Sequence, residues 1–366
     1  MADNQTTFRP DYAPSPGELL EEQLDSLNIS AREFSRRCGR SAKLITEILS
    51  GKAALEPETA LQFERVLDIE ANIWLRMEAE YRLSLARKAD TTRLSADINW
   101  AKSFPLAELR RRGAIEAPQD DADAVKKLLQ FFGLASAAAC REQFSALALS
   151  YRHSPSFRSE ENALFAWLRL GELESAKISI KDYDRANFMK ALHTIRGLTT
   201  TTADVFHPRM VELCAAAGVA FVVLPPLDKL ALSGISRWLT PRKALIQQTL
   251  RHMADDHFWF TFFHEAAHLL FHSRKSVFVD GHKIATSDSP DEDEANKWAT
   301  SYLVPRSALE GFIGEGVFTQ HSVKRFAAEI GIAPGIVVGQ LQKRRAIPYS
   351  HLNKLKQNFQ WTTDQK

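Results

Sequence analysis

The sequence predicts a mainly α protein with one small β-sheet. Apolar residues recur with helical period through most of the chain between residues 17 and 198, and few β-like runs interrupt them. Runs typical of strands are confined to residues 219–249, where prolines separate them. A strongly apolar helix is then expected at 258–271. The 366 residues are enough for two or three domains.

Composition narrows the class of protein. Apolar residues make up 45% of the chain and charged residues 25%, which is typical of a globular protein with a real core. The net charge of +2 excludes a global field that would attract nucleic acid or membrane, so any nucleic-acid surface must be local. Cys38, Cys140 and Cys214 are far apart, which excludes a disulfide framework and suits a reducing cytoplasm. We expect a soluble cytoplasmic protein with no signal peptide and no membrane association.

The N-terminal part is expected to be helical after a flexible arm at residues 1–16. Ser30 is a good N-cap, and Glu33 three residues later predicts a capping box. Ser41 is the N-cap expected for the next helix, which Gly51 ends. The helices expected here lie at about 17–27, 31–37, 41–49, 57–67 and 72–87.

After the N-terminal part, the predicted secondary structure is helical up to about residue 198 and includes strands beyond it. Helices are expected from about residue 94 to residue 198. Polar residues with Gly281 and Pro290 predict a loop at 273–290, and a helix is expected from Glu292 to Leu303. The strands expected before the apolar helix lie at 219–224, 234–239 and 244–249.

The apolar helix contains the motif His264-Glu265-Ala-Ala-His268. Residues four apart share one face of a helix, so both imidazoles can reach one ion, and Glu265 can face a water beside it. Zinc makes such a water acidic enough for a carboxylate base to take its proton. The alternative is a pair of core histidines that are hydrogen-bonded to neighbours. The apolar flanks favour the metal, because burying Glu265 with two histidines is costly unless something satisfies them.

A third protein ligand is needed, with one position left open for water. His272 continues the series, but it lies about 12 Å along the helix from His264, too far for one ion, so it is expected to support the site or to lie at the surface. The carboxylates at 291–294 are better candidates, although they could also be a solvated cluster favoured by the helix dipole. Spacing alone does not choose between Glu292 and Glu294.

Residues 258–272, together with the later Glu292-Asp-Glu-Ala-Asn-Lys-Trp-Ala-Thr-Ser-Tyr-Leu-Val-Pro305, resemble the ImmA/IrrE family of metallopeptidases. The resemblance covers roughly residues 200–345. It implies one zinc ion per chain, with His264, His268 and Glu292 as ligands and Glu265 as catalytic base. Ala267 stands where the family commonly has glycine. His272, Asn296 and Glu294 are the candidates to support the ligands, and His257, His282 and Tyr302 are candidates to stabilise an oxyanion.

Residues 17–87 resemble helix-turn-helix domains of the Xre type, most closely the HigA-like antitoxins, and the matching segment is 29–52. The resemblance implies that the helix at about 41–49 enters the major groove of double-stranded DNA. Basic residues outnumber acidic ones in this segment. Glu47 is a departure, since it would repel phosphate unless it reads a cytosine amino group. The residues expected to contact DNA are Arg40, Ser41, Lys43, Thr46 and Lys52.

Other interpretations of these helices stay open. The N-terminal helices could form an ordinary bundle with a solvated basic face, or bind a toxin or repressor protein instead of DNA. A second candidate helix-turn-helix lies at Val323–Ala346, but the resemblance to the ImmA/IrrE family implies that this segment belongs to the peptidase region, so it is expected to serve packing. Ile45, Ile48 and Leu49 are expected to form the core side of the groove-facing helix.

The predicted architecture is an all-α helix-turn-helix domain, a helical connector and an α+β zincin-like metallopeptidase domain. The predicted function is a transcriptional regulator fused to a zinc endopeptidase that cleaves a repressor or antitoxin protein. The alternative is a transcription factor or antitoxin whose peptidase-like domain is a non-catalytic sensor. A homodimer is plausible, because helix-turn-helix proteins commonly read paired half-sites. The predicted boundaries are 1–16 (arm), 17–90 (helix-turn-helix), 91–198 (connector), 199–346 (peptidase) and 347–366 (tail).

Overall fold

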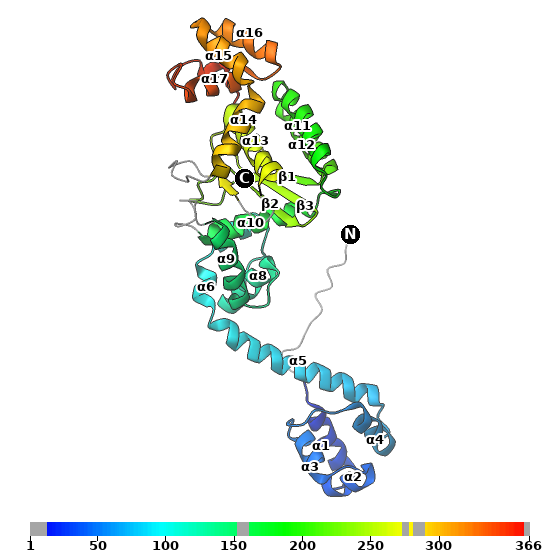
Figure 1. The fold of residues 1–366 in the computed structure, drawn as a ribbon. Coiled ribbons are helices and arrows are strands. Elements are labelled where there is room, and N and C mark those ends of the chain that lie inside the picture. The colour runs from blue at the N-terminus through cyan, green and yellow to red at the C-terminus, as the bar shows by residue number, and fades with distance from the viewer. Residues whose placement is uncertain (1–12, 152–160, 273–277, 281–289, 362–366) are drawn as a thin grey trace. The chain divides into compact units, whose positions relative to one another are not determined.

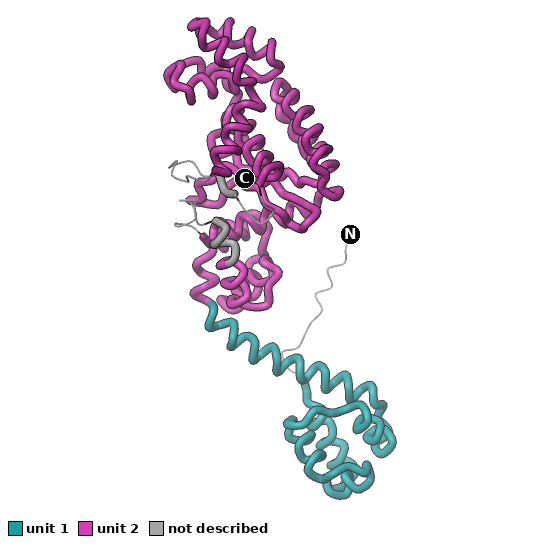
Figure 2. The backbone as a smooth tube through the Cα atoms, viewed as in Figure 1, with its two compact units in different colours: residues 1–97 teal, residues 98–366 magenta. Residues whose placement is uncertain are grey.

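The computed structural model describes residues 13–151, 161–272, 278–280 and 290–361. Contacts divide the chain into two compact units, Met1–Asp97 and Ile98–Lys366 (Figure 2). The described part of the chain is mainly helical, with one small sheet, which confirms the predicted fold class (Figure 1). The finer division into five segments remains a prediction. Within the described residues, no helix combines the length and apolarity needed to cross a bilayer.

Unit 1 is a helical bundle around an aromatic core. Phe63 makes edge-on contacts with Phe34 and Trp74, and all three side chains are fully buried. Ile45 and Ile48 join this core, while Leu49 is only half-buried at its edge. Its described helices are α1 (Pro16–Ser26), α2 (Ala31–Cys38), α3 (Ala42–Leu49), α4 (Pro57–Leu67) and α5 (Ala71–Ser95).

The predicted caps are partly correct. The Ser41 hydroxyl accepts a hydrogen bond from the Leu44 amide, and the Ser30 hydroxyl accepts one from the Glu33 amide. The predicted capping box at Ser30 is wrong, because the Glu33 carboxylate turns along α2 to pair with Arg36 and Arg37. Two guanidinium groups one turn away compete successfully with the single backbone amide of the cap.

In the first part of unit 2, helix α10 (Glu161–Ser175) packs against the sheet. Arg237 on strand β2 (Gly234–Thr240) is buried and pairs with Glu172 on helix α10, and it also donates to the Leu168 carbonyl oxygen. These contacts fix α10 on one face of the sheet. The helices of this first part are α6 (Ile98–Lys102), α7 (Leu106–Arg111), α8 (Asp121–Phe132), α9 (Ala137–Tyr151), α10 (Glu161–Ser175), α11 (Arg185–Gly197), η2 (Leu198–Thr200) and α12 (Ala203–Ala216).

The sheet has strand order β1-β3-β2-β4. Strand β1 pairs parallel with β3, and β2 pairs antiparallel with both β3 and β4. The strands are β1 (Val219–Val223), β2 (Gly234–Thr240), β3 (Lys243–Gln248) and β4 (Phe278–Asp280). The loop predicted at 273–290 is therefore wrong at β4, where three residues pair with β2; of the remainder, 273–277 and 281–289 lie outside the described residues.

Alternation along β1 separates the two faces of the sheet. Val219 and Phe221 enter the main core, whereas Ala220 and Val222 face the other side. Helix α13 (Asp255–Phe271) packs on the main-core face against β2 and β3, and most of its residues are buried, the polar ones His264, Glu265 and His268 included. The remaining helices are α14 (Pro290–Leu303), α15 (Arg306–Glu315), α16 (Gln320–Ile330), α17 (Pro334–Lys343) and η3 (Asn353–Leu355).

Helices α16 and α17 supply the main core rather than an exposed binding unit. Val323, Ala327 and Val337 are completely buried in the same cluster as α13. This burial agrees with the packing role expected for the segment. The chain after α17 returns to the start of α13, where Ala254 forms an antiparallel bridge with Asn358.

Candidate functional site

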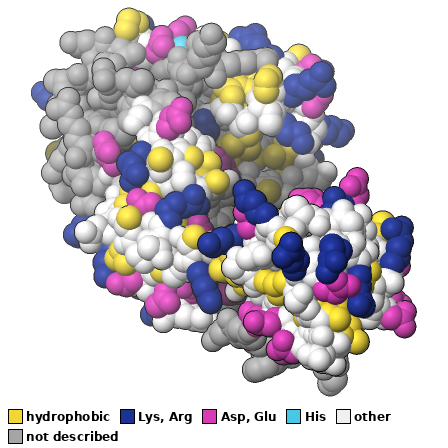
Figure 3. Space-filling model, turned by 90° about the horizontal axis from the view of Figure 1, so that it is seen from below, with side chains coloured by type: hydrophobic (Ala, Val, Ile, Leu, Met, Phe, Trp, Pro, Cys, Tyr) yellow, Lys and Arg dark blue, Asp and Glu magenta, His cyan; other side chains and the backbone are white. Residues whose placement is uncertain are grey.

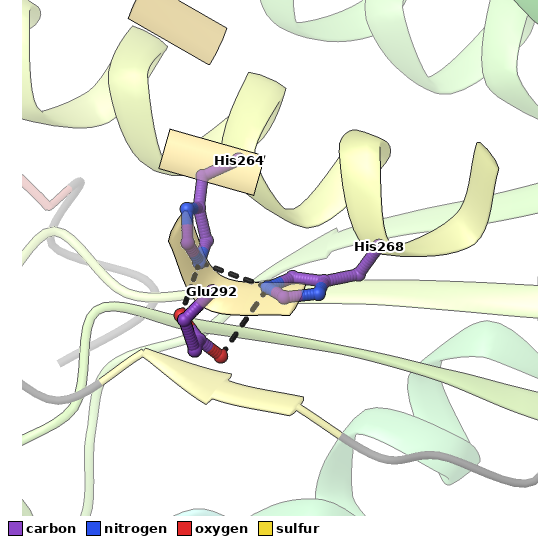
Figure 4. Close-up of side chains that lie close together, drawn as sticks. All are labelled: His264, His268 and Glu292. Atoms are coloured by element: carbon purple, nitrogen blue, oxygen red, sulfur yellow. Dashed lines mark hydrogen bonds and ion pairs between the residues drawn. The ribbon is translucent and has the colours of Figure 1, made fainter. Parts of the chain in front are cut away.

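Helices α13 and α14 bring three candidate ligands together. His264 and His268 lie one turn apart on α13, and Glu292 projects from the first turn of α14 (Figure 4). The two Nε2 atoms are 3.0 Å apart, and the Glu292 carboxylate oxygens lie 3.3 Å from His264 Nε2 and 3.5 Å from His268 Nε2. The sequence left Glu292 and Glu294 open, and the tertiary structure places Glu292 at both imidazoles.

The three ligand atoms have the spacing of a tetrahedral zinc site. Bonds of about 2.0–2.1 Å to one ion place neighbouring ligand atoms about 3.3 Å apart. The observed distances fall on either side of that value, and both histidines are buried. Burial, followed by the neighbouring His264 and His272, holds the pKa of His268 far below its usual value, so its ring is neutral. A neutral imidazole is the form that binds a metal.

Glu265 lies beside the ligands and faces the sheet. Its side chain is completely buried. A Cβ added to Gly234 on β2 would lie 3.2 Å from both Cγ and Oε1 of Glu265, and 2.7 Å from Cγ2 of Thr261. The absence of a side chain at Gly234 thus makes room for the Glu265 carboxylate. The residue pattern of the chain did not single out this glycine, because no strand-to-helix contact can be read from local sequence.

His272 contacts His268 on the side away from His264 and Glu292. Its Nδ1 is 2.7 Å from Nδ1 of His268, and its side chain is only 3% exposed. Its Nε2 lies 3.4 Å from Glu294 Oε2 and 3.9 Å from Asp291 Oδ1. Glu294 is thus linked to the ligands through His272. Asn296 is half-buried one turn beyond Glu292 on α14.

The oxyanion candidates are spread over several elements. Tyr302 stacks on Trp298 with ring centroids 4.5 Å apart, and burial raises its pKa. His257 stacks on His252 at 4.3 Å. His282 lies outside the described residues.

The candidate DNA contacts occupy the exposed side of α3 and its flanks. Lys43, Thr46 and Lys52 are exposed, and Lys43 Nζ lies 3.8 Å from Glu47, which offsets part of the repulsion expected there. The other two candidates, Ser41 and Arg40, make contacts within unit 1. The Ser41 hydroxyl caps α3, while the Arg40 guanidinium reaches Gln62 and lies 3.4 Å from the Glu58 carboxylate. The face drawn in Figure 3 mixes Lys and Arg with Asp and Glu side chains, in keeping with the low net charge.

The C-terminal part of the chain has a family match. Residues 250–338 match Peptidase_M78, the IrrE N-terminal-like domain. This span contains α13, α14 and the three clustered candidate ligands. The family match therefore includes the part of the chain in which His264, His268 and Glu292 come together.

The N-terminal part is similar to known regulators. It is 38% identical over 82 residues to the uncharacterized HTH-type transcriptional regulator YddM of Escherichia coli strain K12, which covers 22% of this chain and 87% of that protein. The chain belongs to the HTH-type transcriptional regulators. This regulator is also 32% identical over 74 residues to virulence-associated protein I of Dichelobacter nodosus, covering 20% of the chain and 68% of that protein. Virulence-associated protein A of the same organism is 32% identical over 73 residues, with 19% and 72% covered.

Proposed function

We propose that this chain is a cytoplasmic DNA-binding transcriptional regulator fused to a zinc-dependent endopeptidase, and that it cleaves a regulatory protein such as a repressor or an antitoxin. The observation that supports the peptidase is the triangle of His264, His268 and Glu292, whose spacing suits one tetrahedral ion. The family match over residues 250–338 supports the same class of chemistry.

The ligands would be Nε2 of both histidines and the Glu292 carboxylate. A divalent ion held there would act as a Lewis acid toward a carbonyl oxygen and toward water. Glu265 would accept the proton of the attacking water and pass it to the leaving amine. Its burial against β2 holds the carboxylate in place and limits competing water.

His272 is proposed as the residue that positions His268. A metal-binding histidine usually donates its second ring N–H to a partner, which fixes the tautomer and the ring plane. His268 Nδ1 would donate to Nδ1 of His272, and His272 Nε2 would donate to Glu294. This arrangement leaves the Nε2 lone pair of His268 directed at His264 and Glu292.

The regulator part would bind double-stranded DNA through α3. Lys43, Thr46 and Lys52 would contact the duplex, and Arg40 and Ser41 would lie at the start of the helix. The identity to YddM and the exposed polar side of α3 support this proposal. Two such units in a homodimer would read paired half-sites.

Metal analysis and cleavage profiling together test the peptidase. We expect one zinc per chain in the wild type and in Glu265→Gln, but little in His264→Ala or Glu292→Ala. His351→Ala, at an exposed histidine on another segment, is the matched control. Wild-type protein should cut a peptide library and Glu265→Gln should not. Undiminished zinc in both ligand variants would contradict the site. Full zinc without any cleavage would favour the sensor alternative.

A further inference from the structure

The face of α13 that holds the ligands continues toward its N-terminus with Phe260. Phe260 lies four residues before His264, so the two side chains share one side of the helix. Their ring centroids are 5.9 Å apart, and Phe260 is only half-buried. Its ring therefore forms a wall beside the candidate metal centre that still meets solvent.

Helix α17 places a positive charge on this wall. Lys343, its last residue, sets Nζ 4.6 Å from the centroid of the Phe260 ring, within the range of a cation–π contact. Lys343 is thus one aromatic ring away from His264. Arg344 and Arg345 follow and are both exposed.

Two glycines fix the course of α17 along α13. A Cβ on Gly335 would lie 2.3 Å from the Asp255 carboxylate, and one on Gly339 would lie 2.5 Å from Asp256 Oδ2. The two helices therefore touch at successive turns of α17, and the next turn delivers Lys343 to Phe260. The position of the ammonium group is consequently set by close helix packing.

The opposite end of the centre is acidic. Asp291 and Glu294 lie near His272, with about half of each side chain exposed, and Asp293 beside them is exposed as well. Positive charge at the Phe260 end and negative charge at the His272 end give the site a polarity along α13. A charged peptide bound across it would have different energies in its two orientations.

We propose that Lys343 and Phe260 form a subsite for an acidic side chain of the peptide substrate, within about two residues of the scissile bond. An extended peptide advances about 3.3 Å per residue, so a neighbouring side chain spans the distance from the ligands to this wall. The ammonium group attracts the carboxylate, and the ring covers its methylene groups. The carboxylates of α14 repel the same side chain, which selects one orientation. This inference rests on the proposed peptidase function.

Cleavage profiling with a charge reversal tests the subsite. Zinc-loaded full-length protein is incubated with a peptide library made from a denatured bacterial proteome, and cut sites are read by mass spectrometry. In the wild type, Asp and Glu should be enriched at one position near the cut. In Lys343→Glu that position should favour Lys and Arg instead, a change of about threefold to fivefold for a solvent-accessible pair. Lys324→Glu, an equal charge change at an exposed site on α16, should keep the wild-type profile. An identical profile in Lys343→Glu would overturn the subsite.

A binding measurement separates this inference from the peptidase proposal. Fluorescent nine-residue alanine-based peptides carrying two Asp, Asn or Lys residues are titrated against zinc-loaded Glu265→Gln and against the double variant Glu265→Gln/Lys343→Glu. The Asp peptide should bind about threefold more tightly than the Asn peptide to the first protein, the Lys peptide should be preferred by the second, and salt should weaken both preferences. If the wild type cuts nothing, the peptidase proposal fails while this order of affinities still supports the subsite. Equal or absent binding in both proteins overturns it.

Discussion

Gly234 on β2 lies directly against Glu265 on α13. A Cβ there would come within 3.2 Å of Oε1, closer than most real Cβ contacts. The proposed base therefore keeps its position only while residue 234 of β2 has no side chain.

Gly234→Ala should lower kcat by tenfold or more while zinc content is retained. The added methyl group must displace Glu265 or Thr261, and an error of about 1 Å in a reacting group can cost about a hundredfold in rate. The measurement is cleavage rate beside zinc analysis and thermal unfolding. Gly311→Ala is the control, because a Cβ there meets nothing within 4 Å. Full activity in Gly234→Ala would contradict the placement of Glu265.

His272→Phe should weaken zinc affinity by about tenfold to a hundredfold. The ring shape is kept, but the Nδ1 acceptor for His268 is lost, and such supporting partners typically contribute this much. Competition with a chromophoric chelator measures the dissociation constant. His272→Gln offers a side-chain carbonyl oxygen and should recover part of the affinity, whereas a merely space-filling role would make the phenylalanine variant the better one.

Asp255 should make the metal-free protein less stable as pH rises from about 4 to about 7. Burial, with help from the negative charge of Asp256, raises the pKa of Asp255 to about 7. A group with a raised pKa in the folded state stabilises the fold below its unfolded value, and this stability is lost as pH rises through the folded value. A shift of about 3 units corresponds to about 4 kcal/mol.

Urea unfolding of wild type and Asp255→Asn in the presence of a chelator measures this effect. The free energy of unfolding of the wild type should fall relative to that of Asp255→Asn across the same pH range. The chelator removes any contribution from pH-dependent zinc binding. Parallel curves for the two proteins would show that Asp255 does not titrate in this range.

Lys43→Ala and Lys52→Ala should each weaken duplex DNA binding and reduce the salt slope by about one. Both side chains are exposed, Lys43 on α3 and Lys52 just after it. A variant that makes one phosphate contact fewer releases fewer counterions when it binds DNA. Anisotropy titrations at several salt concentrations measure the slope. Lys324→Ala on α16 serves as control. Arg40→Ala is less informative, because Arg40 also contacts Gln62 and Glu58 within the unit. Absence of duplex binding at low salt would refute the DNA proposal.

Local sequence was sufficient for the helical class, for Ser30 and Ser41 as N-caps and for the pair His264 and His268. Helical period, capping hydroxyls and the four-residue spacing are all properties of neighbouring residues, so no tertiary information is needed. The prediction at Glu33 failed because two nearby arginines competed for one carboxylate. The loop prediction failed at β4, whose three residues are defined by pairing with β2 and carry no periodic pattern of their own.

The sequence alone determined which side chains could bind a metal. Residue type and the four-residue spacing of the two histidines are properties of the sequence itself, and both can be recognised without a structure. The tertiary structure decided which carboxylate meets them, that His272 turns toward His268, that Gly234 makes room for Glu265 and that Lys343 reaches Phe260. Each of these relationships joins separate elements or depends on how a helix end packs. Such contacts follow from how whole helices and strands bury their surfaces together, and no local pattern encodes them.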